Sequence, residues 1–182
     1  MVLLETARLR LRQFTSDDVD RLVELDSDPE LMRYVTFGAP TPRERYVDVF
    51  LPRWAPLLGY WAAEERATSE FQGWFHLRPD RIDAGEQELG YRLRRASWGR
   101  GFATEGAAAL VEHGFRRVGA DKISARALAG NAASQAVMGK CGLRYEADFV
   151  YSQDTIGGRT GAECAAVKYS ITRSQWQAAR TA

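Results

Sequence analysis

The stretch from Trp98 to Glu105, Trp-Gly-Arg-Gly-Phe-Ala-Thr-Glu, contains the residues best suited to bind a ligand. Its glycines, Gly99 and Gly101, stand directly before an alanine-rich run of helical character. Glycine lets the backbone approach a ligand closely, and the N–H groups and dipole of the following helix favour an anion. The stretch therefore predicts a pyrophosphate site. The alternative is a strand-to-helix turn that needs glycine only for its backbone geometry.

The elements that must position this loop are predicted by the pattern of apolar residues. Residues 86–94 alternate as in a strand, and residues 103–118 have helical spacing, with Gly119 as the left-handed residue at the end. Other strands are predicted at 7–14, 60–66, 70–77, 122–127, 144–151 and 162–171, and other helices after 15–18 and at 132–141. The last two strands would pair around Gly157 and Gly158.

Hairpins come first in this order and strand–helix–strand crossovers come later. The predicted fold is therefore α/β (α+β), a mixed and mostly antiparallel central sheet of about seven strands with helices on both faces. With 182 residues and no linker rich in Ser or Gly, the chain is expected to form a single domain over residues 1–182.

Two common nucleotide-binding motifs do not fit the glycine loop. A P-loop would end in Gly-Lys-Ser/Thr, which is absent, and a dinucleotide fingerprint would need glycine where this chain has Thr104. A second motif, Asn-Ala-Ala-Ser-Gln-Ala-Val-Met-Gly-Lys-Cys-Gly-Leu, occupies residues 131–143. Together with the loop, the Leu-Glu-Thr-Ala-Arg-Leu-Arg-Leu-Arg opening and Glu-Leu-Gly-Tyr at 88–91, it resembles the GNAT N-acetyltransferase superfamily. Within it, the chain looks like the Rim-type branch of ribosomal-protein N-terminal acetyltransferases.

This resemblance implies acetyl-CoA as the cosubstrate, no metal, and direct transfer of the acetyl group to a primary amine. Backbone N–H groups of the glycine loop would hold the pyrophosphate, and the strand edge at Leu93 and Arg94 would pair with the pantetheine arm like an added strand. Asn131 would hydrogen-bond the pantetheine, although it can equally cap the helix that follows. The residues expected to bind acetyl-CoA are Leu93, Arg94, Trp98, Gly99, Arg100, Gly101, Phe102, Ala103, Thr104, Asn131 and Ser134.

Catalysis requires a base, because an alkyl ammonium must lose a proton before it attacks. Such a group contributes about 10²–10⁴-fold to the rate. Glu88 matches the place where histone-modifying members of the superfamily carry a catalytic Glu, and alternation puts Glu88, Gly90 and Arg92 on one face of the strand. The alternative for Glu88 is an ordinary exposed strand residue. Its rival Glu105 lies in the first turn of a helix, where a structural role is expected.

The leaving thiolate would profit from a proton donor. Many family members carry Tyr seven residues after the motif Asn, where this chain has Met138. Ser134 is the substitute that Rim-type members use near the sulfur, and its alternative is a capping role with Asn131. Tyr145 and Tyr151 qualify as donors by residue type alone.

The two histidines and two cysteines are weaker candidates for a catalytic or metal-binding role. His113 is expected on the surface of its helix, and His76 ends a strand from which it could approach the site. Cys141 and Cys164 lack metal-ligand spacing, and Cys141 is expected to be packed in the interior.

Composition excludes several classes of protein. The formal net charge of +1 disfavours a globally basic nucleic-acid binder, and the first residues resemble neither a signal peptide nor a membrane span. A cytoplasmic enzyme, monomeric or homodimeric, that acetylates a protein N-terminus or a small-molecule amine is the leading hypothesis. The other is a non-catalytic module that binds acyl-CoA with the same fold.

Overall fold

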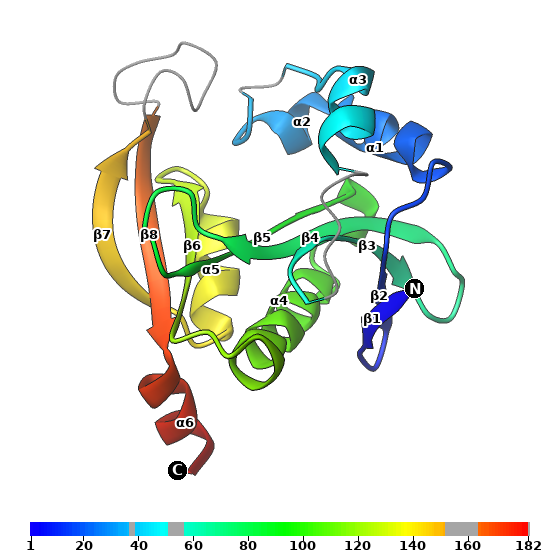
Figure 1. Cartoon of the computed structure of the whole chain (residues 1–182). Coiled ribbons are helices and arrows are strands. Elements are labelled where there is room, and N and C mark those ends of the chain that lie inside the picture. The colour runs from blue at the N-terminus through cyan, green and yellow to red at the C-terminus, as the bar shows by residue number, and fades with distance from the viewer. Residues whose placement is uncertain (37–38, 51–56, 152–163, 182) are drawn as a thin grey trace.

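A computed structural model describes residues 1–36, 39–50, 57–151 and 164–181 of the protein (Figure 1). One eight-stranded sheet has the spatial order β1-β2-β3-β4-β5-β6-β8-β7. Its strands are β1 (Val2–Glu5), β2 (Leu9–Arg12), β3 (Gly59–Glu65), β4 (Phe71–Pro79), β5 (Gln87–Leu93), β6 (Lys122–Leu128), β7 (Arg144–Val150) and β8 (Ala165–Thr172). All neighbouring strands are antiparallel except β5 and β6, which are parallel. The predicted mixed, mostly antiparallel sheet is confirmed.

Helices cover both faces of this sheet, as predicted (Figure 1). They are α1 (Asp18–Asp26), α2 (Pro29–Met32), α3 (Arg43–Arg45), α4 (Phe102–His113), α5 (Ala132–Lys140) and α6 (Arg173–Thr181). Short turns η1 (Tyr46–Phe50), η2 (Arg95–Ser97) and η3 (Gly114–Val118) join them to their neighbours. On one face, apolar residues of α1 and α2 pack on Ala62 and Trp74. On the other face, α4 and α5 pack on the side that carries Trp61, Phe75 and Leu89.

The two parallel strands in the middle of the sheet separate soon after they meet. They pair only at Gln87 with Ile123 and at Glu88 with Ser124, whereas β5 continues to Leu93. Its other edge stays paired with β4 along the whole length. The carboxyl-terminal half of β5 therefore has a free edge in the centre of the sheet.

The structure corrects three expectations from sequence. Strand β1 and the helices α2, α3 and α6 were not predicted. The helix over 103–118 is α-helical only to His113 and then becomes the wider turn η3, although Gly119 does close it with φ +81°. His113 is not a surface residue: it is buried, and its Nε2 lies 2.8 Å from the carbonyl oxygen of Leu57. The predicted turn at Gly157 and Gly158 lies outside the described residues.

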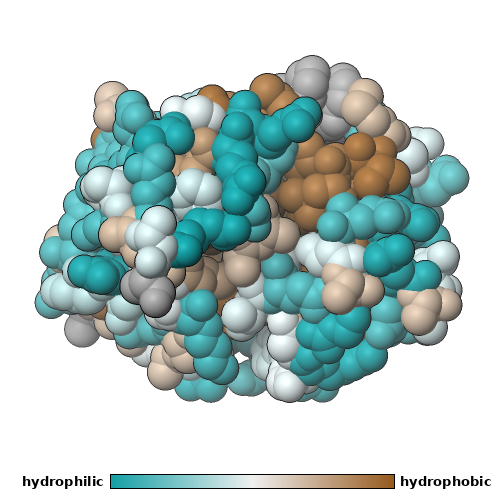
Figure 2. All heavy atoms as spheres, turned by 90° about the horizontal axis from the view of Figure 1, so that it is seen from below, coloured by the Kyte–Doolittle hydropathy of each residue, from teal (hydrophilic) through white to brown (hydrophobic). Residues whose placement is uncertain are grey.

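The surface agrees with the balanced composition. Figure 2 shows one face on which hydrophilic residues predominate, with the largest group of hydrophobic residues at the upper right and smaller groups elsewhere. Among the described helices, none is both long and apolar enough to cross a membrane.

Candidate active site

A groove of about 460 Å³ lies beside the free edge of β5. Its walls come from the end of β5, the glycine loop, the first turns of α4 and α5, and the segment from α2 to Val35. The predicted acetyl-CoA residues that line it are Leu93, Trp98, Gly99, Gly101, Ala103, Thr104, Asn131 and Ser134. Residues from three separate stretches of sequence thus meet around one groove.

The glycine loop has the backbone geometry that an anion site requires. Gly99 has φ +71°, and Gly101, the N-cap residue of α4, has φ +82°. L-residues with a side chain rarely adopt this left-handed conformation. The first turn of α4 contributes N–H groups that have no partner within the helix, which favour negative charge in the groove.

Three predicted residues place their side chains elsewhere. Phe102 is fully buried, with the guanidinium groups of Arg8 and Arg100 at 4.7 and 4.6 Å from its ring centre. Arg100 also pairs with Glu65, and Arg94 reaches the carbonyl oxygen of Phe71. Because these side chains have other partners, we expect only the backbone groups of Phe102, Arg100 and Arg94 to contact acetyl-CoA.

Glu105 has the structural role expected from its helix position. Its carboxylate accepts hydrogen bonds from the Thr6 hydroxyl at 2.5 Å and from the Arg8 backbone N–H at 2.8 Å. Arg8 also donates to Glu105 through its side chain and to the carbonyl oxygen of Arg100. These contacts tie the glycine loop to the β1–β2 turn.

A smaller cavity of about 130 Å³ lies next to the groove and is lined by residues of both β5 and β6. It is lined by Trp74, His76, Glu88, Leu89, Gly90, Tyr91, Ala107, Ala125, Arg126, Ser134, Val137, Met138 and Cys141. Tyr91, Ser134 and Val137 line both cavities and so mark the junction between them. A thioester in the groove and an amine in the smaller cavity would meet at this junction.

Glu88 lies in the smaller cavity and is largely buried. It pairs with Arg78, its direct neighbour on β4, and lies 3.9 Å from Arg126 and 4.0 Å from His76 Nε2. Burial raises the pKa of Glu88, while the positive charges of Arg78 and Arg126 oppose that rise. A carboxylate with a raised pKa is a better proton acceptor at neutral pH than an exposed one.

Sequence reasoning missed Tyr91, a tyrosine that the fold brings to the site. Its hydroxyl lies 3.2 Å from the hydroxyl of Ser134, and burial raises the pKa of Tyr91 to about 12. The phenol is therefore protonated at neutral pH and available as a donor. Met138, at the position where many relatives carry Tyr, is buried in the core. The sequence did contain a signal for Tyr91, which is its position in β5. It follows Glu88 by three residues and therefore lies on the opposite face of the strand, toward α4 and α5.

The other residues that the sequence singled out have structural roles or lie outside the two cavities. The side-chain oxygen of Asn131 accepts the backbone N–H of Ser134 at 3.1 Å, so the predicted cap exists. Burial raises the pKa of Cys141 to about 11, which keeps its thiol protonated, as expected for a packed cysteine. Tyr145 is half exposed on β7, outside both cavities. Tyr151 lines neither cavity, and burial together with the negative charge of Glu88 raises the pKa of Tyr151 to about 12.

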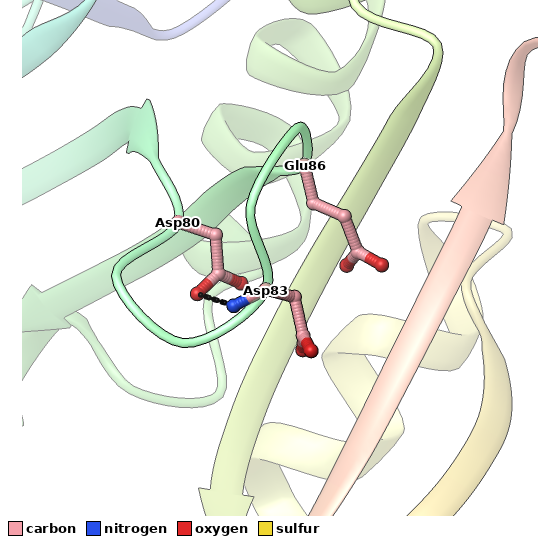
Figure 3. Close-up of side chains that lie close together, drawn as sticks. All are labelled: Asp80, Asp83 and Glu86. Carbon is pink, nitrogen blue, oxygen red and sulfur yellow. Dashed lines mark hydrogen bonds between the residues drawn. The ribbon is translucent and has the colours of Figure 1, made fainter.

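Three carboxyl groups near the end of β4, those of Asp80, Asp83 and Glu86, lie within 4.8 Å of one another (Figure 3). Each is paired with a cationic side chain. Arg126 binds both Asp80 and Asp83, and Lys168 binds both Asp83 and Glu86. Because the guanidinium and ammonium groups already supply positive charge, this cluster is a salt-bridge network that holds β6 and β8 to the loop before β5.

Comparison with known proteins identifies the family. A model of the acetyltransferase (GNAT) domain matches residues 8–144. The chain belongs to the GNAT acetyltransferase family. It is 34% identical to the FsC-acetyl coenzyme A-N(2)-transacetylase of Aspergillus fumigatus over 95% of this chain and 77% of that protein. As a GNAT enzyme, it is an acyltransferase that depends on acetyl-CoA and acts on an amine acceptor.

Solved GNAT structures share the fold. A GNAT-family acetyltransferase from Bacillus anthracis superposes with a TM-score of 0.78 at 23% identity, covering 96% of this chain and 99% of that one. Spermidine N-acetyltransferase from Vibrio cholerae, solved with CoA and spermine, has a TM-score of 0.77 at 16% identity, covering 94% and 99%. The left-handed glycines before α4 suit the pyrophosphate of the family's cosubstrate.

Proposed function

We propose that this GNAT enzyme moves the acetyl group of acetyl-CoA directly to a primary amine while both substrates are bound. The observation that carries the proposal is the junction of the two cavities. Tyr91 and Ser134 line both cavities, and Glu88 lines the smaller one. Donor and acceptor can thus enter from different sides and meet between a buried carboxylate and two hydroxyl groups.

In this proposal, the groove holds acetyl-CoA. Backbone N–H groups of Gly99, Gly101 and the first turn of α4 bind the pyrophosphate, and the free edge of β5 near Leu93 bonds the pantetheine arm. Asn131 caps α5 and thereby sets the position of Ser134. Main-chain groups of the glycine loop with α4, and of β5, would therefore supply most of the affinity for acetyl-CoA.

Glu88 is proposed as the group that receives the proton of the acceptor ammonium. Its burial and its place in the smaller cavity support this role. On the other side of the junction, the hydroxyl groups of Tyr91 and Ser134 are placed to donate a hydrogen bond to the departing sulfur. Ser134 was predicted for this task, and Tyr91 joins it because the two hydroxyl oxygens lie 3.2 Å apart.

The finer assignment follows from sequence resemblance. We assign the chain to the Rim-type branch, with a protein N-terminus or a small-molecule amine as acceptor and with residues 1–182 as one domain. A cytoplasmic location and a monomer or homodimer accord with the composition. The near-neutral net charge of +1 does not favour nucleic acid as a partner.

Calorimetric titration tests the donor site. Acetyl-CoA and CoA should bind with Kd in the micromolar range, whereas ATP should give no heat, since it lacks the pantetheine arm that pairs with β5. Equal binding of ATP would indicate a general phosphate site and contradict the proposed groove. Thiol release from acetyl-CoA upon addition of protein N-terminal peptides and small amines then tests transfer.

Removing either hydroxyl at the junction should slow turnover and leave donor binding intact. We expect kcat to fall about tenfold or more in Ser134→Ala and Tyr91→Phe, because one donor near the sulfur is lost. The double variant should be little worse than the stronger single variant, since the two hydroxyls act as one bonded pair. Fully additive losses would argue for separate roles, and unchanged kcat in both variants would exclude the pair as donors.

A further inference from the structure

His76 occupies the centre of the sheet at the smaller cavity. It lies on β4 directly opposite Gly90 of β5 and Tyr60 of β3. The residue is 8% exposed, and its ring centre lies 4.8 Å from that of Tyr60 and 5.7 Å from that of Trp74. The imidazole is thus held in place by aromatic neighbours and faces the cavity that contains Glu88.

The glycine in the Glu-Leu-Gly-Tyr segment makes room for this ring. A Cβ atom at position 90 would lie 2.6 Å from Cε1 and 2.7 Å from Nε2 of His76. Real Cβ atoms do not approach so closely, so any side chain at Gly90 would displace the imidazole. Gly90 therefore has a specific task, which is to let His76 lie flat against the β5 backbone beside Glu88.

Both ring nitrogens of His76 lack a hydrogen-bond partner among the described residues, although they are buried. An unpaired buried polar atom destabilises the folded state, so proteins keep such atoms mainly where they have a role. Nε2 lies 4.0 Å from the Glu88 carboxylate, slightly beyond direct hydrogen-bond distance. The histidine therefore faces Glu88 with one nitrogen and carries a second nitrogen that no described residue satisfies.

Burial and the surrounding positive charges keep the imidazole of His76 neutral. Burial lowers the pKa of His76 well below its ordinary value, and the positive charges of Arg78, Arg92 and Arg81 act in the same direction. The groups that face it are Arg78, Asp80 and Arg81 from β4 and the loop after it, Glu88 and Arg92 from β5, and Tyr60 from β3. A neutral imidazole has one nitrogen that accepts and one that donates, which is what a proton relay needs.

We propose that His76 is a catalytic residue that passes the proton of the acceptor ammonium to Glu88. This inference rests on the proposed function. One ring nitrogen takes a proton from the ammonium, and the other, Nε2, gives its proton to the Glu88 carboxylate that it faces. The products of the step are a neutral amine, a neutral Glu88 and an imidazole in its other tautomer, so protons and charge balance. The amine lone pair is then free to attack the thioester carbonyl.

The kinetic test uses acceptors of different basicity. Propylamine, glycinamide and aminoacetonitrile have ammonium pKa values that fall in this order, and at pH 7 the last is already a free amine. His76→Gln should lower kcat/KM about 10²-fold for propylamine and less than tenfold for aminoacetonitrile. His113→Gln, which alters the other buried histidine outside both cavities, is the matched control and should show no dependence on acceptor basicity. A loss in His76→Gln that is the same for all three amines would overturn the relay, because a packing defect acts on every acceptor alike.

An independent measurement requires no acceptor. Since the chain has only two histidines, the ¹⁵N resonances of His76 can be assigned as those missing from the His76→Gln spectrum. We expect a neutral ring down to pH 6, with a tautomer balance that changes in Glu88→Gln. An imidazole that is protonated at pH 6, or one unaffected by Glu88→Gln, would exclude the relay. If the wild type acetylates none of the three amines, a small-molecule acceptor is excluded and a protein N-terminus is left as the proposed acceptor, and the NMR result still decides the role of His76.

Discussion

Glu88→Gln should lower kcat by about 10²–10⁴-fold for a basic amine and leave the Kd of acetyl-CoA nearly unchanged. The amide keeps the size and one oxygen of the side chain but cannot take a proton. Glu88 lines only the smaller cavity, so donor binding in the groove has no direct contact to lose. Stopped-flow or steady-state detection of CoA thiol, together with calorimetry, separates the two effects.

The pH profile gives a second signature of the same residue. Because burial raises the pKa of Glu88 above its usual 4.5, the wild type should lose activity on the acid side at a higher pH than an ordinary carboxylate would cause. Activity is present above this pKa, where Glu88 is charged, and disappears below it. Glu88→Gln should remove this acid limb.

Glu146→Gln is the control for this experiment. Glu146 is also an ion-paired carboxylate on a strand, bound to Lys122 and Lys168, yet it lines neither cavity. It should retain kcat within a few-fold. If Glu88→Gln kept the wild-type kcat and acid limb, another group would have to be the base.

Gly101→Val should raise the Kd of acetyl-CoA about 10²-fold or more, which corresponds to about 2.7 kcal/mol. Gly101 has φ +82°, a conformation that costs an ordinary L-residue about 1–2 kcal/mol and a β-branched residue more. In addition, a Cβ atom there would lie 3.2 Å from the guanidinium of Arg8, which anchors the loop through the carbonyl oxygen of Arg100. The loop must then rearrange, and its N–H groups lose their common direction.

Gly119→Val provides a control with the same backbone strain. Gly119 has φ +81° at the end of η3, and a Cβ atom added there would meet no atom within 4 Å. The residue lines neither cavity. It should lower the melting temperature about as much as Gly101→Val does, while calorimetry should show acetyl-CoA binding close to that of the wild type. Equal loss of binding in both variants would mean that general strain, and not the shape of the loop, weakens the site.

The amino-acid sequence by itself determined the local elements of this protein. Alternation and helical spacing predicted all the strands except β1, and the helices α1, α4 and α5, because burial of one face imposes these periods on each segment separately. The glycine loop before α4 and the cap at Asn131 were also predictable, since their signals lie within a few residues of the feature. Strand β1 and helix α6 were not predicted, because short or strongly polar segments depend for their structure on contacts with other parts of the chain.

Only the tertiary structure shows how the residues of the candidate site lie relative to one another. The parting of β5 from β6 depends on the order of strands in the sheet. The approach of Tyr91 to Ser134 depends on how α5 packs against that sheet. His76 gained its place beside Glu88 only through the register of β4 and β5. Such contacts join residues that are distant in sequence, so no local pattern encodes them, and packing of the whole core determines them together.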